Sequence, residues 1–443
     1  MIVGIIGGGI TGLTAAYELM KKGHKPIVIE QDVQLGGQAG TFATEGDPLE
    51  RFYHHLFKTD LDIVGLIREL GLDSKLSWLE SRTGYFHGGT IYPFVSPIDL
   101  MRFKPLSLSD RIRLGLMYLR LQRDKDWQSK ESLTAKEWIV RHGSQKIYDV
   151  FWGPLLRGKF AESAEEVSMT WLWGKIFLRG ASRTRAMTRE QLGYLDGSFQ
   201  VLIDALADKI RAGSGEILTT TRVDRIEIDN AQVKGLEVRS SIGGSSSAWN
   251  SPSRISCDRV IATVSSPAFL SIAPELPGDY ADKLRRVRYQ TAVCVVLQMS
   301  QPLSQTYWTN IGDRSIPFVG VIEHTNFVPA SKYGGAHIAY LTNYISPAHP
   351  LFRATDGQIL EEYLPHLKKI NPRFDQSWIR RFHVFRDNGG QPIVTTNYSG
   401  LVPDHRTPID GLYLANTTQI YPEDRGTNYS VRLGQKIAGI VGG

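Results

Sequence analysis

The sequence predicts an α/β fold that begins with a parallel β-sheet. Residues 2–6 (IVGII) form an apolar run that is typical of a buried strand, and residues 11–22 have the apolar spacing of an amphipathic helix. Residues 26–30 (PIVIE) form a second apolar run. A strand, a helix and another strand in this order predict a βαβ unit with two parallel strands.

The length of the chain predicts more than one domain. Its 443 residues exceed what one hydrophobic core supports, and 42% hydrophobic and 22% charged residues are in the globular range. Helical spacing predicts further helices at 60–70, 97–123, 131–142, 145–156 and 199–212, and a last one from about 427. Apolar or alternating runs predict strands at 216–220, 222–228, 233–239, 258–263, 289–299, 335–345 and 411–415, with a hairpin tip at 240–247.

A glycine motif lies between the first strand and its helix. Gly7, Gly9 and Gly12 form a GxGxxG pattern. Gly7 permits a tight turn, Gly9 lets the backbone approach a pyrophosphate, and Gly12 lets the helix pack close to the strand. Ile10 and Thr11 begin the helix, whose N-terminus attracts the phosphates. The motif in this context predicts a Rossmann-type dinucleotide site.

An acidic residue ends the second strand. The carboxylate of Glu30 is placed to accept hydrogen bonds from the ribose hydroxyls of an adenosine, and it would repel a 2′-phosphate. We expect Gln31, the next residue, at the same site.

A second glycine motif (LGGQAGT) identifies the dinucleotide. Gly36 and Gly37 resemble the glycine doublet of the superfamily of flavin monoamine oxidases, protoporphyrinogen oxidases, phytoene desaturases and UDP-galactopyranose mutases. The resemblance implies FAD, with the backbone of the doublet against the pyrophosphate and ribityl chain. Gln38 stands where that superfamily usually has an arginine, so one cation near the phosphates is replaced by a neutral donor.

The C-terminal end resembles the same superfamily. Residues 411–416 (GLYLAN) are similar to its GLYLAGD strand, and the resemblance implies that Asn416, in place of the acid, hydrogen-bonds to FAD. The helix that follows is expected to direct the backbone of Thr427 and Asn428 at the flavin N1–C2=O edge. Val223 resembles the valine whose backbone meets the adenine.

These motifs predict a discontinuous arrangement of three parts. We expect an FAD-binding domain of Rossmann type, a substrate-binding domain with a mixed sheet, and a helical subdomain. The FAD-binding domain takes residues 1–60, 195–265 and 400–443, the substrate-binding domain 61–95 and 266–399, and the helical subdomain 96–194.

Two histidines are candidates for catalysis beside the flavin. The run containing His54 and His55 is similar to a stretch in UDP-galactopyranose mutases. An imidazole there could stabilise anionic reduced flavin or relay a proton. The alternative is that one or both histidines pack in the fold and hydrogen-bond to backbone.

Basic residues are candidates for binding the substrate. Arg157 and Lys159 lie in a run (FWGPLLRGKF) that resembles a cavity-lining segment of protoporphyrinogen oxidases and mutases. They could neutralise a carboxylate or phosphate, or form surface ion pairs instead. Arg425 is expected near the flavin together with Tyr421 and Tyr429, unless it pairs with its acidic neighbours 423 and 424.

Several residue patterns are missing from the sequence. The stretch 291–297, where flavin amine oxidases usually carry a lysine, has none, and no cysteine lies beside the C-terminal loop. Amine oxidation with covalent flavin is therefore disfavoured, and we expect non-covalent FAD. The histidines show no metal-binding spacing, so no metal is expected. The absence of a nucleic-acid motif leaves a small molecule, hydrophobic or anionic, as the expected partner.

Two functions remain open. The first is a protoporphyrinogen-oxidase- or desaturase-like oxidoreductase, in which FAD takes a hydride from a C–H or C–N centre. The second is a mutase-like enzyme that acts on a nucleotide sugar with reduced FAD, which His54, His55, Arg157 and Lys159 favour.

The residues of 97–123 predict contact with a membrane surface as one alternative. Apolar residues alternate there with arginines, as in helices that lie on anionic lipid. The other alternative is that the apolar face packs within the protein. With two cysteines, no leader-like first residues and no long apolar run, the expected location is the cytoplasm, with a peripheral contact at the inner membrane.

Overall fold

The computed structural model describes residues 1–181, 190–241 and 249–443, and the predicted βαβ unit forms the centre of a five-stranded parallel sheet. α1 (Ile10–Lys21) connects β1 (Ile2–Ile6) to β2 (Lys25–Ile29). The other strands are β9 (Glu216–Leu218), β13 (Arg259–Ala262) and β19 (Leu412–Leu414), and the order is β19-β13-β1-β2-β9. Both ends and the middle of the chain therefore meet in one sheet.

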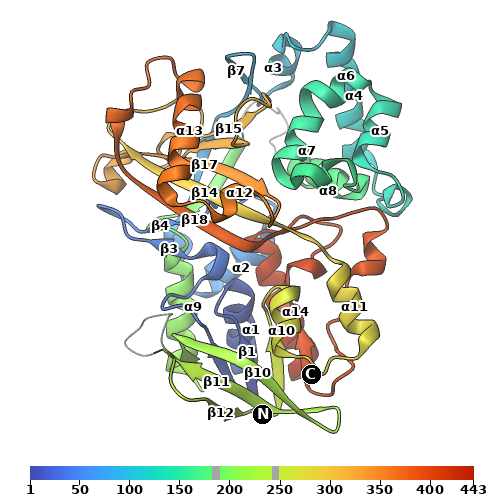
Figure 1. The fold of residues 1–443 in the computed structure, drawn as a ribbon, viewed down its shortest axis with the longest axis vertical. Coiled ribbons are helices and arrows are strands. Elements are labelled where there is room, and N and C mark those ends of the chain that lie inside the picture. The colour runs from blue at the N-terminus through green and yellow to red at the C-terminus, as the bar shows by residue number, and fades with distance from the viewer. Residues whose placement is uncertain (182–189, 242–248) are drawn as a thin grey trace.

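Helices cover this sheet. α14 (Thr427–Gly442) packs closely on α1, because a Cβ at Gly434 would lie 2.7 Å from the carbonyl oxygen of Thr11. The neighbouring helices are α2 (Leu61–Glu69), α9 (Gln200–Ala212), α10 (Ser266–Ile272) and α11 (Gly278–Arg286). An antiparallel sheet of β10 (Thr221–Asp229), β11 (Gln232–Ser240) and β12 (Ser253–Ser256) lies beside them. Figure 1 shows this part in the lower half of the molecule.

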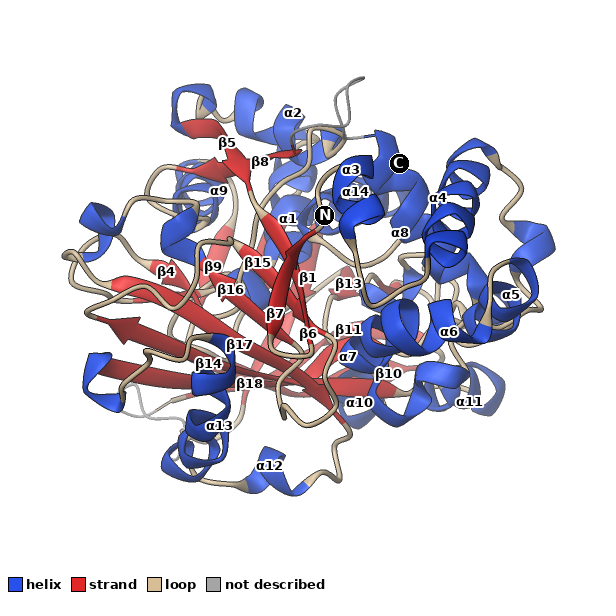
Figure 2. Ribbon diagram, turned by 90° about the horizontal axis from the view of Figure 1, so that it is seen from above, coloured by secondary structure: helices blue, strands red, loops and turns tan. Residues whose placement is uncertain are grey.

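A seven-stranded mixed sheet lies above the parallel sheet in Figure 1. Its strand β14 (Tyr289–Met299) is buried along its whole length, which explains the apolar run 292–297 at its centre. The order is β18 (Ile379–Pro392), β14, β17 (His337–Ile345), β16 (Gly320–Glu323), β15 (Trp308–Ile311), β6 (Thr83–His87) and β7 (Thr90–Pro93). α12 (Pro350–Arg353) and α13 (Asp356–Ile370) lie at one side of this sheet (Figure 2).

A group of helices lies beside the mixed sheet, at the upper right of Figure 1. They surround a second hydrophobic cluster that contains Phe103, Trp138, Phe151 and Trp171. The group comprises α3 (Pro97–Arg102), α4 (Leu108–Arg123), α5 (Ala135–His142), α6 (Gln145–Ile147), α7 (Gly153–Phe160) and α8 (Met169–Ala181). Two short two-stranded sheets, β3 (Thr41–Phe42) with β4 (Leu49–Glu50) and β5 (Leu76–Ser81) with β8 (Glu190–Leu195), connect the parts.

The prediction of one continuous helix over 97–123 is wrong, because the structure has two helices there. The chain leaves the helix at Phe103 and begins α4 after Ser107, whose side chain accepts from the amide of Asp110. Pro105 explains the break, because it has no N–H and disfavours helical backbone at Lys104. The predicted helix at 145–156 instead runs from α6 through a π-helical turn, Tyr148–Trp152, into α7.

The other expected elements agree with the structure to within a few residues, and α8, α10, α11, α13 and β18 are among the elements that were not expected. The predicted hairpin tip at 240–247 lies mostly outside the described residues. The three-part division of the chain stays a prediction in its boundaries. Among the described residues, no helix is long and apolar enough to span a membrane.

Candidate functional site

The two glycine motifs lie against each other at the end of β1. Gly36 donates from its amide to the carbonyl of Gly8 at 2.9 Å, and Gly9 forms a β-bridge with Gly36. A Cβ at Gly9 would have only Gly36 and Gly37 nearby, both at 3.9 Å, whereas a Cβ at Gly12 would lie 2.0 Å from the carbonyl oxygen of Gly7. Gly9 therefore borders open space at the start of α1, and Gly12 is needed for helix packing. This cradle fits the pyrophosphate of a dinucleotide.

Glu30 lies beside this cradle. Its carboxylate accepts from the amide of Gly8 at 2.7 Å and from the amide of Asp32 at 2.9 Å, and burial raises its pKa despite these bonds. The carbonyl of Glu30 accepts from the amide of Thr221, which brings β10 and the buried Val223 next to the end of β2. Gln31 is exposed at the same edge.

The side chains of Asn416 and Asn428, near the C-terminus, hydrogen-bond to other residues of the protein. Nδ2 of Asn416 donates to the carbonyl of Val264 and to the hydroxyl of Ser266. Oδ1 of Asn416 accepts from the backbone N–H and the hydroxyl of Thr418. All four hydrogen-bonding positions of this side chain thus have protein partners. The side chain of Asn428 likewise bonds the amide of Ile63 and the carboxylate of Asp62. The backbone of Asn416 is also engaged, because its N–H donates to Oε1 of Gln419 and its carbonyl accepts from the N–H of Gln419.

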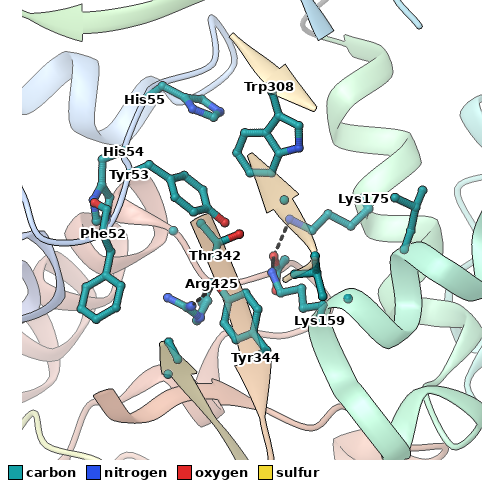
Figure 3. Close-up of a pocket in the computed structure, with 18 of the residues that line it drawn as sticks. Phe52, Tyr53, His54, His55, Lys159, Lys175, Trp308, Thr342, Tyr344 and Arg425 are labelled. Carbon is teal, nitrogen blue, oxygen red and sulfur yellow. Dashed lines mark hydrogen bonds and ion pairs between the residues drawn. The ribbon is translucent and has the colours of Figure 1, made fainter. Parts of the chain in front are cut away.

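A cavity of about 400 Å³ opens where α14 begins, between the parallel and the mixed sheets. Gly426, which precedes α14, and Thr427 and Asn428 in its first turn line it, and no side chain caps this helix end. Figure 3 shows His54 and Arg425 on one side of the cavity and Lys159 and Lys175 on the other, with Thr342 and Tyr344 of β17 between them. Aromatic walls are contributed by Phe52, Tyr53, Phe57, Trp152, Trp171 and Trp308.

Both predicted histidines line this cavity. Nδ1 of His54 lies 2.6 Å from the carbonyl oxygen of Phe52, and Nδ1 of His55 lies 3.0 Å from the hydroxyl of Tyr307. A carbonyl oxygen only accepts, so Nδ1 of His54 carries the proton and Nε2 is the acceptor. Burial lowers the pKa of His54 to about 4. His54 is therefore neutral at physiological pH, so Nε2 can accept a hydrogen bond but the ring carries no fixed charge that would stabilise an anion.

Arg425 lines the cavity, and three neutral side chains accept hydrogen bonds from its guanidinium. It donates from Nε to Gln391 at 2.9 Å, from Nη1 to Gln38 at 3.1 Å and from Nη2 to the hydroxyl of Tyr344 at 3.0 Å. Gln38 in turn donates to the carboxylate of Asp387 at 2.7 Å. The expected alternative, a direct hydrogen bond from Arg425 to residue 423 or 424, is not what the structure shows.

The acid before Arg425 binds two lysines. Nζ of Lys159 lies 2.5 Å from Oδ2 of Asp424, and Lys175 forms an ion pair with the same oxygen. Trp171 donates to Oδ1 of Asp424 at 3.0 Å. Burial alone would raise the pKa of Asp424, but the two lysines lower it well below its ordinary value, so this carboxylate stays ionised.

Arg157 and Tyr421, which were expected at the site, do not line the cavity. Arg157 is not among the residues that line the cavity; it packs beside Tyr148 and Tyr85, and burial and Arg314 lower its pKa. Because α7 turns Lys159 inward, Arg157, two residues earlier, faces another direction. The hydroxyl of Tyr421 donates to Glu131, away from the cavity, whereas Tyr429 lines it.

Several polar residues of the cavity were not predicted from the sequence, among them Trp171, Lys175 and Asp387. Lys175 and Trp171 are four residues apart on α8 and so share one face of the helix, but no motif marks α8. Asp387 belongs to a bulge in β18, where the pairing with β14 shifts between Gln290 and Ala292. An (i, i+4) Trp–Lys pair was the one signal that the sequence offered.

Both cysteines are free and buried. Cys294 lines the cavity, and burial raises its pKa, which keeps the thiol protonated and poorly nucleophilic. This agrees with a flavin that is not attached through cysteine. Among the described residues, no group of three or more potential ligands could hold a metal ion.

Comparison with known proteins matches residues 10–422 to the family described as flavin containing amine oxidoreductase. A 15-cis-phytoene desaturase of an Oncidium hybrid cultivar is 24% identical over 439 residues, which cover 93% of this chain and 72% of the desaturase. Protoporphyrinogen oxidase 2 of Arabidopsis thaliana is 24% identical over 174 residues, 38% of this chain and 34% of that protein. The structure of reduced UDP-galactopyranose mutase has the same fold, with a TM-score of 0.76, 15% identity and coverage of 99% and 95% of the two chains.

Proposed function

Because the chain belongs to the flavin containing amine oxidoreductase family, we propose that this FAD-dependent oxidoreductase oxidises a C–H or C–N centre of a small molecule held in the cavity, as a protoporphyrinogen oxidase or desaturase does. When bound, FAD supplies the hydride acceptor. The observation that carries the proposal is that Gly426 and Thr427, at the uncapped start of α14, line the same cavity as His54 and Arg425.

The residues of the cavity suit this reaction. The amides at the start of α14 and the guanidinium of Arg425 present positive charge where negative charge develops on reduction. The neutral His54, with Nε2 as acceptor, can accept a hydrogen bond from the substrate. The aromatic walls exclude water and fit an apolar or conjugated substrate body.

A spectroscopic assay tests the proposed reaction. The purified protein with FAD is mixed without oxygen and without added reductant with a porphyrinogen or a polyene precursor, and the visible absorbance of the flavin is followed. Loss of this absorbance with formation of an oxidised product is expected. A stable flavin spectrum with every such substrate, combined with turnover of a UDP-sugar only after reduction by dithionite, would contradict the proposal.

The mutase-like function is the second candidate. The support for it is that His54 and His55 both line the cavity and that Lys159 provides a cation for a phosphate there. Arg157, which also favoured it, lies outside the cavity lining.

We further propose that the protein is cytoplasmic and contacts the inner membrane through an apolar patch on α3 and α4. Among the described residues, six of the nine exposed large apolar side chains belong to these two helices: Ile98, Met101, Leu108, Ile112, Leu116 and Leu119. Exposed basic residues surround them at Arg102, Lys104, Arg113, Arg120 and Arg123. Basic residues beside an apolar face favour binding to anionic lipid.

The patch is distinct from the side of α4 that packs in the protein. Leu114, Met117 and Leu121 are buried on one face, and Leu106, just before α4, is only 1% exposed. Leu116 on the opposite face is 61% exposed. A helix that merely covers a core has one apolar stripe. The two stripes of α4 support the membrane contact over packing within the protein.

A further inference from the structure

Two ammonium groups share one carboxylate oxygen in the wall of the cavity. Lys159 of α7 and Lys175 of α8 lie at the same wall of the cavity (Figure 3). Both pair with Oδ2 of Asp424. Since each lies within hydrogen-bonding distance of that oxygen, the two charges are at most about 5 to 6 Å apart. The ring of Trp171 fixes both side chains, with the ammonium of Lys159 5.4 Å and that of Lys175 5.7 Å from its centre.

The position of this cluster is set by close packing of the backbone. A Cβ at Gly174 would lie 2.8 Å from the carbonyl oxygen of Pro422, so only glycine lets α8 approach the loop that carries Asp424 so closely. Trp171 and Gln391 both donate to Oδ1 of Asp424, which holds the carboxylate plane and turns Oδ2 toward the lysines. The backbone packing and these two hydrogen bonds therefore hold Asp424 and the two lysines in a defined position in the cavity wall.

The other acids of the cavity do not touch the lysines. Oδ1 and Oδ2 of Asp387 accept from the amide of Gly389 and from Gln38, at the Arg425 side. Asp60 accepts from the amide of Phe57 at the start of α2, and burial raises its pKa to about 6. Asp424 is therefore the carboxylate that contacts both lysines directly, and the charge of Asp60 also acts on Lys175.

We propose that Lys159 and Lys175 bind an anionic oxygen group of the substrate, a carboxylate or a phosphate, while the apolar walls hold the rest of the molecule. The inference rests on the proposed function, in which the same cavity holds the substrate. Burial and Arg425 lower the pKa of Lys159, so a second anion between the lysines is favoured because it stabilises both charged forms. Trp152, Leu155 and Val319 supply apolar surface to the same cavity.

Calorimetric titration of the FAD-loaded protein tests the anion site without turnover. The probes are 2-naphthoate, 2-naphthyl phosphate and the neutral 2-naphthamide, which share one aromatic body. The wild type should bind at least one anion more tightly than the amide by about tenfold or more, because a charge-assisted hydrogen bond is lost with the amide. The stronger of the two anions identifies the substrate group. Equal affinity for all three probes would overturn the proposal.

Single substitutions give the sharper comparison. Lys159→Met and Lys175→Met each leave Asp424 paired with the other lysine, so neither variant buries an unpaired acid. Each should weaken binding of the preferred anion by about tenfold and change that of 2-naphthamide less than about twofold. Asp424→Asn should act in the opposite direction and tighten anion binding, because the competing carboxylate is gone.

Lys136→Met is the matched control. Lys136 pairs with Glu165 at the surface and is not among the cavity residues, so this variant should bind all three probes as the wild type does. Loss of FAD itself from Lys159→Met or Lys175→Met would assign the lysines to the cofactor and overturn the inference. Anion preference with no oxidation of any substrate would refute only the proposed function, and flavin reduction without anion preference only the anion site.

Discussion

Arg425 donates from Nη1 to Oε1 of Gln38 at 3.1 Å and joins the C-terminal loop to the second glycine motif. Gln38 was expected to leave this region without the cation that relatives of this sequence have there. Because Arg425 is also fixed by Gln391 and Tyr344, the structure supplies a guanidinium to the same region from the opposite end of the chain.

Arg425→Met should lower the reduction potential of the bound FAD. The variant removes a cation from the cavity wall beside the start of α14, and reduced flavin carries the negative charge that this cation stabilises. We expect a fall of about 30 mV or more, which corresponds to about 1.4 kcal/mol for a two-electron couple. Spectroscopic titration with a reference dye measures it. Arg68→Met, at a surface pair with Asp73, is the control, and a potential that is equal in all three proteins would contradict the prediction.

Gly9→Val and Gly12→Val should both abolish FAD retention but for different reasons. A Cβ at Gly9 lies 3.9 Å from Gly36 and Gly37, and a valine there enters the space expected for the pyrophosphate, so the variant should fold and lack flavin. A side chain at Gly12 meets the carbonyl oxygen of Gly7 at 2.0 Å, so this variant should also lose stability, by about 2 kcal/mol or more. Flavin content and urea unfolding of the apoproteins separate the two effects. An apo Gly12→Val protein as stable as apo Gly9→Val would sink this distinction.

Local sequence patterns predicted much of the fold for identifiable reasons. The strand at 289–299 was expected in full because all its residues are buried and its centre, 292–297, is an unbroken apolar run. The helix at 97–123 was expected to be continuous because its apolar spacing persists through Pro105, where backbone geometry interrupts it. The helix α8 was missed although its apolar content is high and Ser168, just before it, accepts from the amide of Thr170.

The site could be predicted where a run of residues resembles a cavity segment of the superfamily or follows the C-terminal strand. His54, Lys159 and Arg425 were expected at the cavity on that basis, and all three line it. Lys175 could not be found in this way, because its place depends on the contact of Gly174 with Pro422, far apart in sequence. Arg157 and Lys159 were equivalent in the sequence, and only the rotation of α7 distinguishes them.

His54 should make the free energy of unfolding decrease as the pH falls. Burial lowers its pKa from 6.5 to about 4, so the unfolded chain binds this proton more readily than the folded one does. Its contribution to stability is therefore fully present above about pH 6.5 and is lost progressively as the pH falls toward 4. Relative to His54→Asn, the wild type should lose about 2 kcal/mol between about pH 7.5 and pH 5.

The comparison with His54→Asn isolates this effect. Asparagine can still donate to the carbonyl of Phe52 but does not titrate. Glu50, whose pKa burial raises to about 7, contributes in the opposite sense, because its stabilisation is present at low pH and is lost as the pH rises through 7. That contribution is common to both proteins and cancels in their difference. Urea unfolding at several pH values gives the result, and a difference that does not change with pH would show that His54 is solvated.

The apolar patch of α3 and α4 should bind anionic vesicles. Ile112 and Leu116 lie four residues apart on the exposed face of α4, so they would enter the lipid together. Each buried side chain of this size contributes roughly 1.5 to 3 kcal/mol in full transfer from water. The double substitution Ile112→Gln and Leu116→Gln should therefore weaken partitioning by at least about tenfold. Flotation with vesicles of neutral lipid, and of neutral with anionic lipid, measures it.

Charge and apolar surface can be separated in the same assay. Arg113→Gln with Arg120→Gln should weaken binding to anionic vesicles only, and added salt should have the same effect, since it screens exposed charges. Leu61→Gln is the matched control, because Leu61 is 72% exposed but lies on α2, outside the patch. If the wild type does not float with either vesicle, α4 exposes its second apolar stripe for another purpose and the membrane contact is refuted. If the protein binds the membrane through α4, Leu61→Gln on α2 should float as the wild type does. If Leu61→Gln weakens flotation as much as the double substitution does, the patch is not the site of contact.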